Sequence, residues 1–366
     1  MRLLIVNLSV SAISGGYEEY LRQFFSRAAK DSQVEAIMFV SVAPVIAKFR
    51  DMPHLICLEM TPMNALLGTL WGMGKTISDF RPDLVYVPME KRLKGLSRYR
   101  HVMMLQNMEP FAQTVPGNSL AWRLILKVMR RRAITALKSA SHVIVLSEFA
   151  AQGVARETGI KAKHISLIPH GISETYNAET NKPEGIATDS SFLFTAGSLA
   201  PARGVEDLIK AYIHLKKTRS LENVKLYIAG GRHRFSRRWL SKIELEIARE
   251  GYERDILWLG HLNRAEMNWC FKNTLLFVIT SRVESFCITA VEAMAAQVPV
   301  ISTKCPCLPE TLADYPDYYQ AGDWQQLAQK IIAVMAGSGE GTRVIPDNMI
   351  SWDENYARTM ALFNNL

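Results

Sequence analysis

The chain has 366 residues, 48% of them hydrophobic and 21% charged, which excludes a disordered or low-complexity chain and suggests two globular domains. Lys and Arg number 43 against 35 Asp and Glu, so the net charge of +8 indicates an anionic partner without identifying it. Five cysteines exclude a disulfide-stabilised scaffold and fit a reducing compartment, so we expect a cytoplasmic protein.

The first ten residues, Met1–Val10, combine an Arg with an apolar run, but they lack a small-residue cleavage site. They predict a buried strand rather than a signal peptide. The most lipid-like stretch, Leu55–Met73, contains Glu59, Pro62 and Asn64, which argue against a transmembrane helix. We therefore expect a protein that at most lies on a membrane surface.

Short apolar runs alternate along the chain with segments of helix length, such as Gly16–Ala29 and Val205–Lys217. Continuous apolar runs are typical of parallel strands covered on both faces. Their alternation with helices predicts doubly wound α/β sheets, and the runs are too many for one sheet. The predicted strands are Leu3–Asn7, Ala36–Val40, Leu55–Leu58, Leu84–Val87, Val102–Leu105, Val143–Leu146, Ser166–Ile168, Phe192–Thr195, Lys225–Ala229, Ile256–Leu259, Leu275–Ile279 and Val298–Ser302.

The longest polar stretch without an apolar run is Ser173–Ser191, which is rich in Asn, Thr, Pro and Gly. It predicts a linker between two α/β domains of similar size. We expect an N-terminal Rossmann-like domain over residues 1–172, a linker over 173–191, a C-terminal Rossmann-like domain over 192–345 and a closing helix over 346–366.

Four motifs that would indicate other functions are incomplete or absent. Gly74-Lys75-Thr76 resembles the end of a phosphate-binding loop, but Thr69 stands where that loop needs a glycine. No Gly-x-Gly-x-x-Gly opens a helix after a strand, so a nicotinamide cofactor is not indicated. Cys305-Pro306-Cys307 has no second ligand pair, and no Asp-x-Asp pair could hold a metal against a diphosphate. We expect neither a metal nor a cofactor.

The most informative segment is Leu275–Glu310, which reads as a buried strand, a polar loop and a helix that starts near Phe286. Such helix starts bind anions, because their first N–H groups are unpaired and the helix dipole is positive there. Glu284 lies just before the predicted helix and Glu292 about two turns inside it, among Ala, Val and Met residues. A carboxylate packed there needs a partner from elsewhere, either the vicinal diol of a ribose or a basic side chain.

The pattern Glu284-x7-Glu292, followed by Ala-Met-Ala and by Pro299-Val300-Ile301, resembles the signature of glycosyltransferase family 4. These are retaining, nucleotide-sugar-dependent enzymes of the GT-B fold, which has two Rossmann-like domains. The resemblance extends over nearly the whole chain. Further segments that resemble family motifs are Gly15-Gly16 with Glu18 and Leu21, Ser147-Glu148, Ile168-Pro169-His170-Gly171, Gly197 to Gly204 with Asp207, Leu208 and Ala211, Ala229-Gly230-Gly231, and Leu259-Gly260-His261-Leu262.

The resemblance implies roles for individual residues. Glu292 would bind the ribose hydroxyls of the donor, Glu284 would hold the sugar near its anomeric carbon, and Arg203 would neutralise the departing diphosphate. The resemblance thus implies Glu284, Arg203 and Asn107 as catalytic residues, and a nucleoside-diphosphate sugar as co-substrate. The implied substrate-binding residues are Gly15, Gly16, Gln106, Gly171, Gly197, Ser198, Gly230, Gly231, Arg232, His261, Ser285, Phe286, Cys287, Ile288, Thr289 and Glu292.

The chain also departs from the family pattern. Ser198 stands where the family often has Arg, so a second diphosphate cation is missing or is supplied by Arg232 or Arg234. Cys287 replaces the usual Gly, which would narrow the sugar pocket. Gln106-Asn107 ends the strand that usually ends in His, and a neutral amide cannot act as a general base. A front-face retaining mechanism tolerates this change, because the leaving phosphate can take the acceptor proton.

Basic residues gather between Glu90 and Lys138, where eleven Lys and Arg face two acids. Apolar residues interleave with them on a predicted amphipathic helix. Docking on anionic lipid headgroups and a merely solvated basic face explain this equally well. Nucleic-acid binding lacks a recognised reader motif. The basic residues are Lys91, Arg92, Lys94, Arg98, Arg100, Arg123, Lys127, Arg130, Arg131, Arg132 and Lys138, and the apolar ones are Trp122, Leu124, Ile125 and Val128.

We therefore expect a retaining glycosyltransferase that moves a sugar from a nucleoside diphosphate to a glycan or lipid-linked acceptor. The acceptor would enter from the N-terminal half, in the synthesis of an envelope polysaccharide such as lipopolysaccharide, on the inner face of the membrane. A nucleotide-sugar epimerase of the same fold and a non-catalytic relative that binds a glycan or a protein remain as alternatives. The sequence leaves the sugar, the base, the acceptor and the oligomeric state open.

Overall fold

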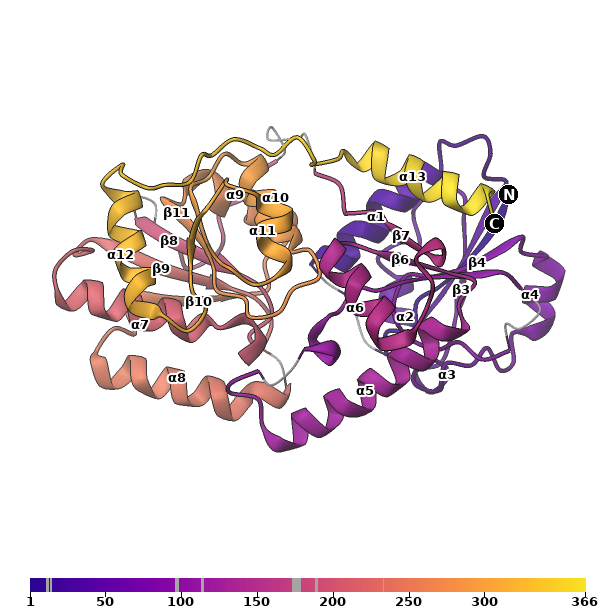
Figure 1. Cartoon of the computed structure of the whole chain (residues 1–366), viewed down its shortest axis with the longest axis horizontal. Coiled ribbons are helices and arrows are strands. Elements are labelled where there is room, and N and C mark those ends of the chain that lie inside the picture. The colour runs from indigo at the N-terminus through magenta and orange to yellow at the C-terminus, as the bar shows by residue number, and fades with distance from the viewer. Residues whose placement is uncertain are drawn as a thin grey trace. The chain divides into compact units, whose positions relative to one another are not determined.

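The computed structural model describes residues 1–10, 13, 15–95, 99–112, 115–172, 179–187, 190–232 and 234–366, with Arg234 described in its backbone alone. These residues form two compact units (Figure 1). Residues 173–178 and 188–189 of the predicted linker lie outside the described residues. Unit 1 comprises Met1–Phe111, Leu126–Gly171 and Ile350–Leu366, and unit 2 comprises Ala112–Ile125 and Ile172–Met349.

Unit 1 is built on a parallel sheet in the order β3-β2-β1-β4-β5-β6-β7. The apolar runs explain this arrangement, because strands such as β4 and β6 are buried along their whole length, as expected of parallel strands covered on both faces. The strands are β1 (Arg2–Val6), β2 (Ala36–Ser41), β3 (Leu55–Glu59), β4 (Leu84–Val87), β5 (His101–Met104), β6 (His142–Val145) and β7 (Ile165–Leu167).

The helices of unit 1 include one that follows all of unit 2 in the sequence. Helix α13 packs on α1, where Arg27 Nε pairs with Asp353 Oδ1 at 2.7 Å. Asn355 Nδ2 donates to the carbonyl of Pro169 at 2.6 Å, so α13 also holds the segment after β7. The helices are α1 (Gly16–Ala28), α2 (Ala43–Ile46), α3 (Pro62–Leu67), α4 (Gly74–Phe80), α6 (Glu148–Thr158) and α13 (Trp352–Asn364), with 3₁₀ turns at Glu109–Phe111 and Ala162–His164.

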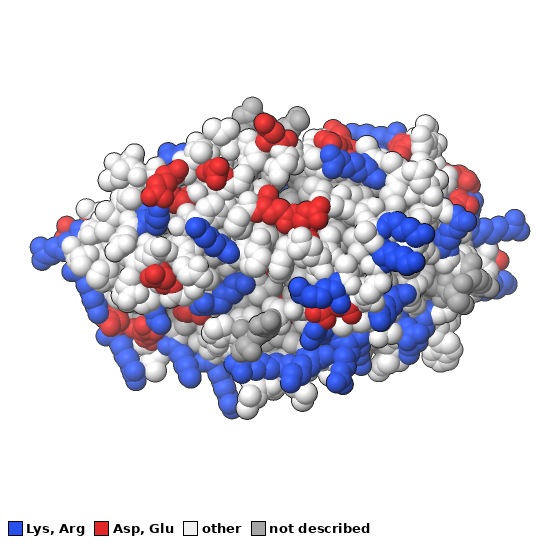
Figure 2. All heavy atoms as spheres, in the orientation of Figure 1, with Lys and Arg blue, Asp and Glu red and all other residues white. Residues whose placement is uncertain are grey.

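Helix α5 (Leu120–Ser139) begins in unit 2 and ends in unit 1. It buries only Ala133, Ala136 and Leu137 and is otherwise open to solvent over much of its length. Lys and Arg side chains gather along it in the view of Figure 2. The predicted amphipathic basic helix therefore forms.

Unit 2 holds a second parallel sheet, in the order β10-β9-β8-β11-β12-β13. Its last strand, β13, has only three residues and was not predicted. The strands are β8 (Ser191–Ala196), β9 (Val224–Ala229), β10 (Ile256–Gly260), β11 (Leu276–Ile279), β12 (Val300–Thr303) and β13 (Asp317–Tyr319). The helices are α7 (Val205–Lys217), α8 (Arg237–Glu250), α9 (Arg264–Asn273), α10 (Ile288–Ala295), α11 (Cys307–Leu312) and α12 (Trp324–Met335), with 3₁₀ turns η3 (Pro201–Arg203) and η4 (Arg234–Ser236).

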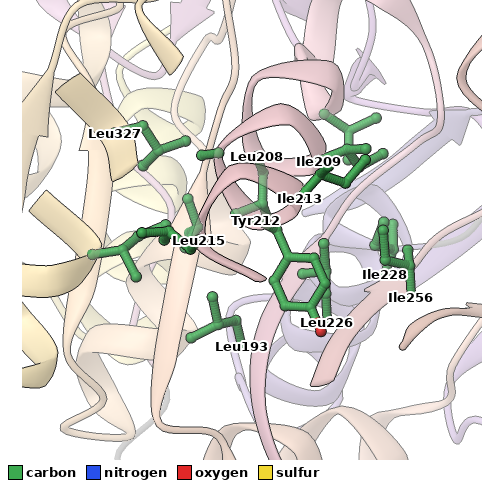
Figure 3. Close-up of a cluster of buried hydrophobic side chains, with 14 of the residues drawn as sticks. Leu193, Leu208, Ile209, Tyr212, Ile213, Leu215, Leu226, Ile228, Ile256 and Leu327 are labelled. Atoms are coloured by element: carbon green, nitrogen blue, oxygen red, sulfur yellow. The ribbon is translucent and has the colours of Figure 1, made fainter. Parts of the chain in front are cut away.

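The core of unit 2 fixes α7 to its sheet (Figure 3). Leu208 and Tyr212 of α7 are fully buried, as is Leu226 of β9. The Tyr212 hydroxyl donates to the carbonyl of Val224 at 2.6 Å, so its polar end is satisfied inside the core. This packing holds the start of α7, which directly follows Arg203, against the sheet.

Both units are thus doubly wound parallel sheets, which confirms the predicted fold class. In unit 1 the strand order reverses between β1 and β4, and in unit 2 between β8 and β11. Ligands of such sheets bind at this reversal, beyond the carboxyl ends of the strands. Functional side chains are therefore expected at these two places.

Candidate active site

The reversal point in unit 2 is formed by the segments after β8 and β11. Gly197 and Ser198 follow β8, and the residues from Thr280 to Glu284 follow β11. Ser281 and Glu284 are buried, whereas Ser198 is exposed. A buried carboxylate at the carboxyl edge of a parallel sheet is costly and needs a cation or several donors.

Arg203 supplies that cation. Its Nη1 forms an ion pair with Glu284 Oε1 and donates to Ser281 Oγ at 3.3 Å. Ser281 Oγ in turn donates to the same carboxylate oxygen at 2.8 Å. The Arg203 side chain is 36% exposed and that of Glu284 only 6%. The structure therefore brings together two predicted catalytic residues that lie on different segments, and adds Ser281, which the sequence did not suggest.

Backbone contacts fix the position of Arg203. Thr280 Oγ1 donates to the Arg203 carbonyl at 2.6 Å, and the Arg282 N–H donates to the Ala202 carbonyl at 2.8 Å. The turn η3 is thus tied to the segment after β11. The Arg203 guanidinium is presented by a supported backbone, although its side chain remains partly open to solvent.

A second ion cluster, just beside the first, supports the same segments. Arg282 Nη2 pairs with Glu206 at 2.8 Å and with Asp207 at 3.1 Å, and all three side chains are largely buried. Burial raises the pKa of the Glu206 carboxyl, although Arg282 opposes this effect. Asp207 Oδ2 also accepts from the Gly322 N–H at 2.8 Å. The cluster links the start of α7 to the segment after β11. Arg282 belongs to no motif predicted from the sequence.

Helix α10 begins at Ile288, two residues later than the predicted start at Phe286. The reason is Cys287, which has φ 74° and therefore lies in the left-handed region that ends or caps a helix. Ser285 and Phe286, before it, are buried, while Ile288 and Thr289 are half-buried. Burial raises the pKa of the Cys287 thiol. The left-handed backbone explains why a glycine would suit this position.

Glu292 lies on α10, about two turns from Glu284. Its side chain is half-buried, between the buried Val291 and Ala293. The expected packed surface around it is present. Its role at the ribose stays a prediction.

Glycines bring the ends of β8, β9 and β10 close together. The Gly230 N–H donates to the Gly260 carbonyl at 2.6 Å, and a Cβ on Gly230 would overlap with the carbonyl of Gly197. Only a glycine fits at Gly230. Gly231 and His261 are exposed beyond these strand ends, where base recognition was predicted.

Neither Arg232 nor Arg234, the additional cations expected for a diphosphate, is seen free to bind one. Arg232 pairs with Glu244 of α8 at 2.6 Å and lies 5.9 Å from the centre of the Trp258 ring. A diphosphate would have to compete with Glu244 for it. The side chain of Arg234 lies outside the described residues, so its role stays a prediction.

The reversal point in unit 1 carries a polar network. Asn7, directly after β1, is fully buried, and its Nδ2 donates to Ser41 Oγ at 2.8 Å. Its Oδ1 accepts from the Tyr17 hydroxyl at 3.1 Å. Gly15 has φ 63° and Gly16 begins α1, so the predicted glycine pair lies at this sheet edge.

Glu90, after β4, lies at the same edge of the sheet and was not predicted as a site residue. Its Oε2 accepts from the Gln106 N–H at 3.1 Å, and burial raises the pKa of its carboxyl. Gln106 Nε2 contacts Met104 Sδ at 2.8 Å, and Asn107 Oδ1 accepts from the Glu109 N–H at 2.9 Å. The signal that could have identified Glu90 is an acid only three residues after the buried strand β4.

Gly171 and its neighbour His170 lie in unit 1. His170 is buried between the rings of Tyr20 and Trp352, and burial lowers its pKa to about 3. A Cβ on Gly171 would overlap with the backbone of Trp352. Packing against α13 accounts for both residues, and substrate binding by Gly171 stays a prediction.

Two family models match the chain in succession. The model described as Glycosyltransferase Family 4 matches residues 15–176, and the one described as Glycosyl transferases group 1 matches residues 177–348. Between them they cover residues 15–348, which is nearly all of unit 2 and most of unit 1 without α13.

Curated relatives match part of the chain. The lipopolysaccharide 1,2-N-acetylglucosaminetransferase of Salmonella typhimurium is 30% identical over 167 residues, which are 43% of this chain and 43% of that protein. Mannosylfructose-phosphate synthase of Agrobacterium fabrum is 25% identical over 179 residues, 45% of this chain and 38% of that protein. The chain thus spans less than half the length of these relatives.

Solved structures match its whole length. HepE of Anabaena, solved with UDP-glucose, has a TM-score of 0.75 at 18% identity and is covered completely, as is this chain. Sucrose-phosphate synthase of Thermosynechococcus elongatus has a TM-score of 0.74 at 16% identity, over all of this chain and 98% of that one. At these identities the likeness concerns the fold.

Two Rossmann-like units, each with polar residues where its strand order reverses, confirm the predicted GT-B fold class. The two matched family models then identify the family within this fold class. The chain belongs to the glycosyltransferases of group 1 and family 4, which confirms the family predicted from the Glu284-x7-Glu292 pattern.

Proposed function

We propose that the chain is a retaining glycosyltransferase that moves a sugar from a nucleoside-diphosphate sugar to a hydroxyl of a glycan or lipid-linked acceptor. The observation that carries the proposal is the Arg203–Glu284 pair at the strand reversal of unit 2, beside the start of α10. HepE, a structural neighbour, was solved with UDP and with UDP-glucose, which makes a UDP-sugar the first donor to test.

Arg203 is the residue that would stabilise the leaving group. In the proposed reaction the bond between the anomeric carbon and the β-phosphate oxygen breaks, and negative charge develops on the nucleoside diphosphate. A fixed guanidinium and the positive end of the α10 helix dipole would offset that charge, and losing one such donor costs about 3 kcal/mol. The acceptor oxygen would bond to the same face of the anomeric carbon and pass its proton to the leaving phosphate.

Glu284 would have two functions. Its carboxylate orients Arg203 in the structure, and it would accept hydrogen bonds from hydroxyls of the donor sugar. Glu292, further along α10, would accept the ribose hydroxyls. Because Arg203 and the helix supply positive charge, we expect turnover to persist in EDTA, without a divalent metal.

The acceptor is proposed from the relatives. The Salmonella relative acts on lipopolysaccharide, and a structural neighbour is a lipopolysaccharide outer core galactosyltransferase (TM-score 0.62, 16% identity, all of both chains). We propose a hydroxyl-bearing envelope glycan, bound at the sheet edge of unit 1 that carries Asn7 and Glu90.

The donor should be tested first by thermal shift with UDP-, GDP- and ADP-sugars. A donor at a hundred times its Kd stabilises its site by about 2.7 kcal/mol, which a melting curve detects. Arg203→Ala should lower turnover of the stabilising donor by about 100-fold. Arg249→Ala, an exposed arginine on α8, is the matched control and should change nothing.

Three results would contradict the proposal. Normal turnover by Arg203→Ala would show that Arg203 does not stabilise the leaving group. Conversion of the donor without any acceptor would favour an epimerase, and tight donor binding without turnover on any acceptor would favour a non-catalytic relative.

A further inference from the structure

Helix α3 and the turn after it expose a cluster of large apolar side chains. Met63 is 60% exposed, Leu66 58% and Leu67 51%, and Trp71 is 86% exposed. We call these four residues the α3 patch. Contiguous apolar side chains of this size on a surface mark a site of interaction with another surface. The patch lies within unit 1 and within the stretch Leu55–Met73 that was too polar for a transmembrane helix.

A buried polar residue holds the patch in place. Asn64 is 6% exposed, and its Nδ2 donates to the Trp71 carbonyl at 3.1 Å. Its Oδ1 accepts from Thr69 Oγ1 at 3.0 Å, and its N–H donates to the capping Thr61 Oγ1 at 3.1 Å. The asparagine is therefore inside and the tryptophan outside, on a turn that is hydrogen-bonded. The exposure of Trp71 belongs to a defined conformation.

Cations flank the patch. The Lys94 N–H donates to the carbonyl of Gly68, the residue that ends α3, at 2.7 Å, so the segment with Arg92 and Lys94 lies directly beside it. Lys75 follows Trp71 at the start of α4. All three cationic side chains are exposed.

The net positive charge of the chain comes from the unit that carries the patch. By sequence, unit 1 has 22 Lys and Arg against 14 Asp and Glu, a net charge of +8, whereas unit 2 has 21 of each. The excess of the whole chain, +8, therefore resides in unit 1. An apolar patch in a basic unit is complementary to a lipid bilayer, whose surface is anionic and whose interior is apolar.

Helix α5, where lipid docking was predicted from the sequence, is a weaker candidate for insertion. Trp122 stacks on Phe235 at 5.0 Å and is not fully exposed. Leu120, Leu124 and Val128 do form an exposed stripe at four-residue spacing among cations. Among the described residues no helix is both long and apolar enough to span a bilayer.

We propose that the α3 patch inserts into the interfacial layer of an anionic lipid bilayer. Trp71 lies at the level of the headgroups, Met63, Leu66 and Leu67 reach the acyl boundary, and Lys75, Arg92 and Lys94 contact anionic headgroups. Tryptophan beside Leu and Met with flanking Lys and Arg is the composition of interfacial segments. The binding needs no donor, so it stands or falls independently of the proposed reaction.

The test uses the full chain and vesicles of phosphatidylcholine, with or without a quarter of phosphatidylglycerol. We expect co-sedimentation with the anionic vesicles only. Trp71→Ser and Leu67→Ser should each weaken it by about tenfold. Leu245→Ser, an exposed leucine on α8 of unit 2, is the matched control and should bind normally.

Fluorescence distinguishes insertion from simple charge attraction. Trp71 is the one exposed tryptophan among the seven, all of which are described. Its emission should shift to the blue on anionic vesicles and be quenched by brominated lipid, and Trp71→Phe should lose both signals while still pelleting.

Three outcomes would overturn the proposal. Equal pelleting on neutral vesicles, or no pelleting at all, would remove the anionic bilayer as partner. Unchanged binding by Trp71→Ser and Leu67→Ser would place docking elsewhere, with Leu124→Ser then identifying α5. Dissociation of a dimer by Trp71→Ser in the absence of vesicles would identify the patch as an interface between copies.

Discussion

The Arg203–Glu284 pair allows a test of the site that needs no substrate. We consider the double-mutant cycle of Arg203→Ala, Glu284→Gln and both together. In the structure the Glu284 carboxylate is 6% exposed, is paired with Arg203 and accepts from Ser281 at 2.8 Å. Without Arg203, the Glu284 carboxylate retains the hydrogen bond from Ser281 but loses its ion pair.

The magnitude follows from burial. Breaking a fully buried pair by removing one partner costs about 3–5 kcal/mol. Arg203 is 36% exposed, so water screens the pair and the cost should fall to about 2 kcal/mol. For a domain the size of unit 2, each kcal/mol lowers Tm by about 2–4 °C. Arg203→Ala should therefore lower the Tm of unit 2 by roughly 4–8 °C.

Glu284→Gln should cost less, because it removes the charge and keeps the volume. When Arg203→Ala is added to the Glu284→Gln variant, the free energy of unfolding should fall little further. The coupling energy between the two residues is then about 1–2 kcal/mol. Urea unfolding followed by circular dichroism measures all four proteins, with Arg249→Ala as the control. Additivity of the two single changes within about 0.5 kcal/mol would refute the assigned contact.

Three further predictions concern stability. The pKa of His170 falls from 6.5 to about 3 on folding, so the unfolded chain binds more protons in that range; stability should fall as pH drops below about 6.5, and His170→Phe should flatten this part of a pH–Tm curve. Cys287→Val should cost about 2 kcal/mol more than Cys287→Gly, because a β-branched residue resists φ 74°; equal urea midpoints would contradict this. Arg282→Ala should cost about 3–5 kcal/mol, since it leaves Glu206 and Asp207 buried beside each other without their cation; a Tm within 2 °C or so of the parent protein would rule this out.

Much of the fold was predictable because its signals are local. Continuous apolar runs located the strands of both sheets, with the exception of Asp317–Tyr319, which is too short to produce such a run. The start of α10 was placed two residues early, because no sequence rule predicts a left-handed cysteine at position 287.

The residues of the site could be predicted from the sequence better than the contacts between them. The resemblance to a family pointed to Arg203 and Glu284, but their pairing depends on β8 and β11 being neighbours in the sheet. Ser281 and Arg282 were missed, because neither belongs to a spacing pattern that could be read without that neighbourhood. Glu90 was missed because an acid shortly after a predicted strand is a weak signal until the fold shows that its carboxyl is buried.

The return of α13 to unit 1 has a consequence for biosynthesis. Trp352–Asn364 supplies Trp352 and Phe363 to the interior of unit 1, yet the ribosome adds this segment after every residue of unit 2. Unit 2 can therefore complete its core while unit 1, which is synthesised earlier, still lacks α13. A nascent chain of this protein would finish folding in the reverse of the order in which its sheets are translated.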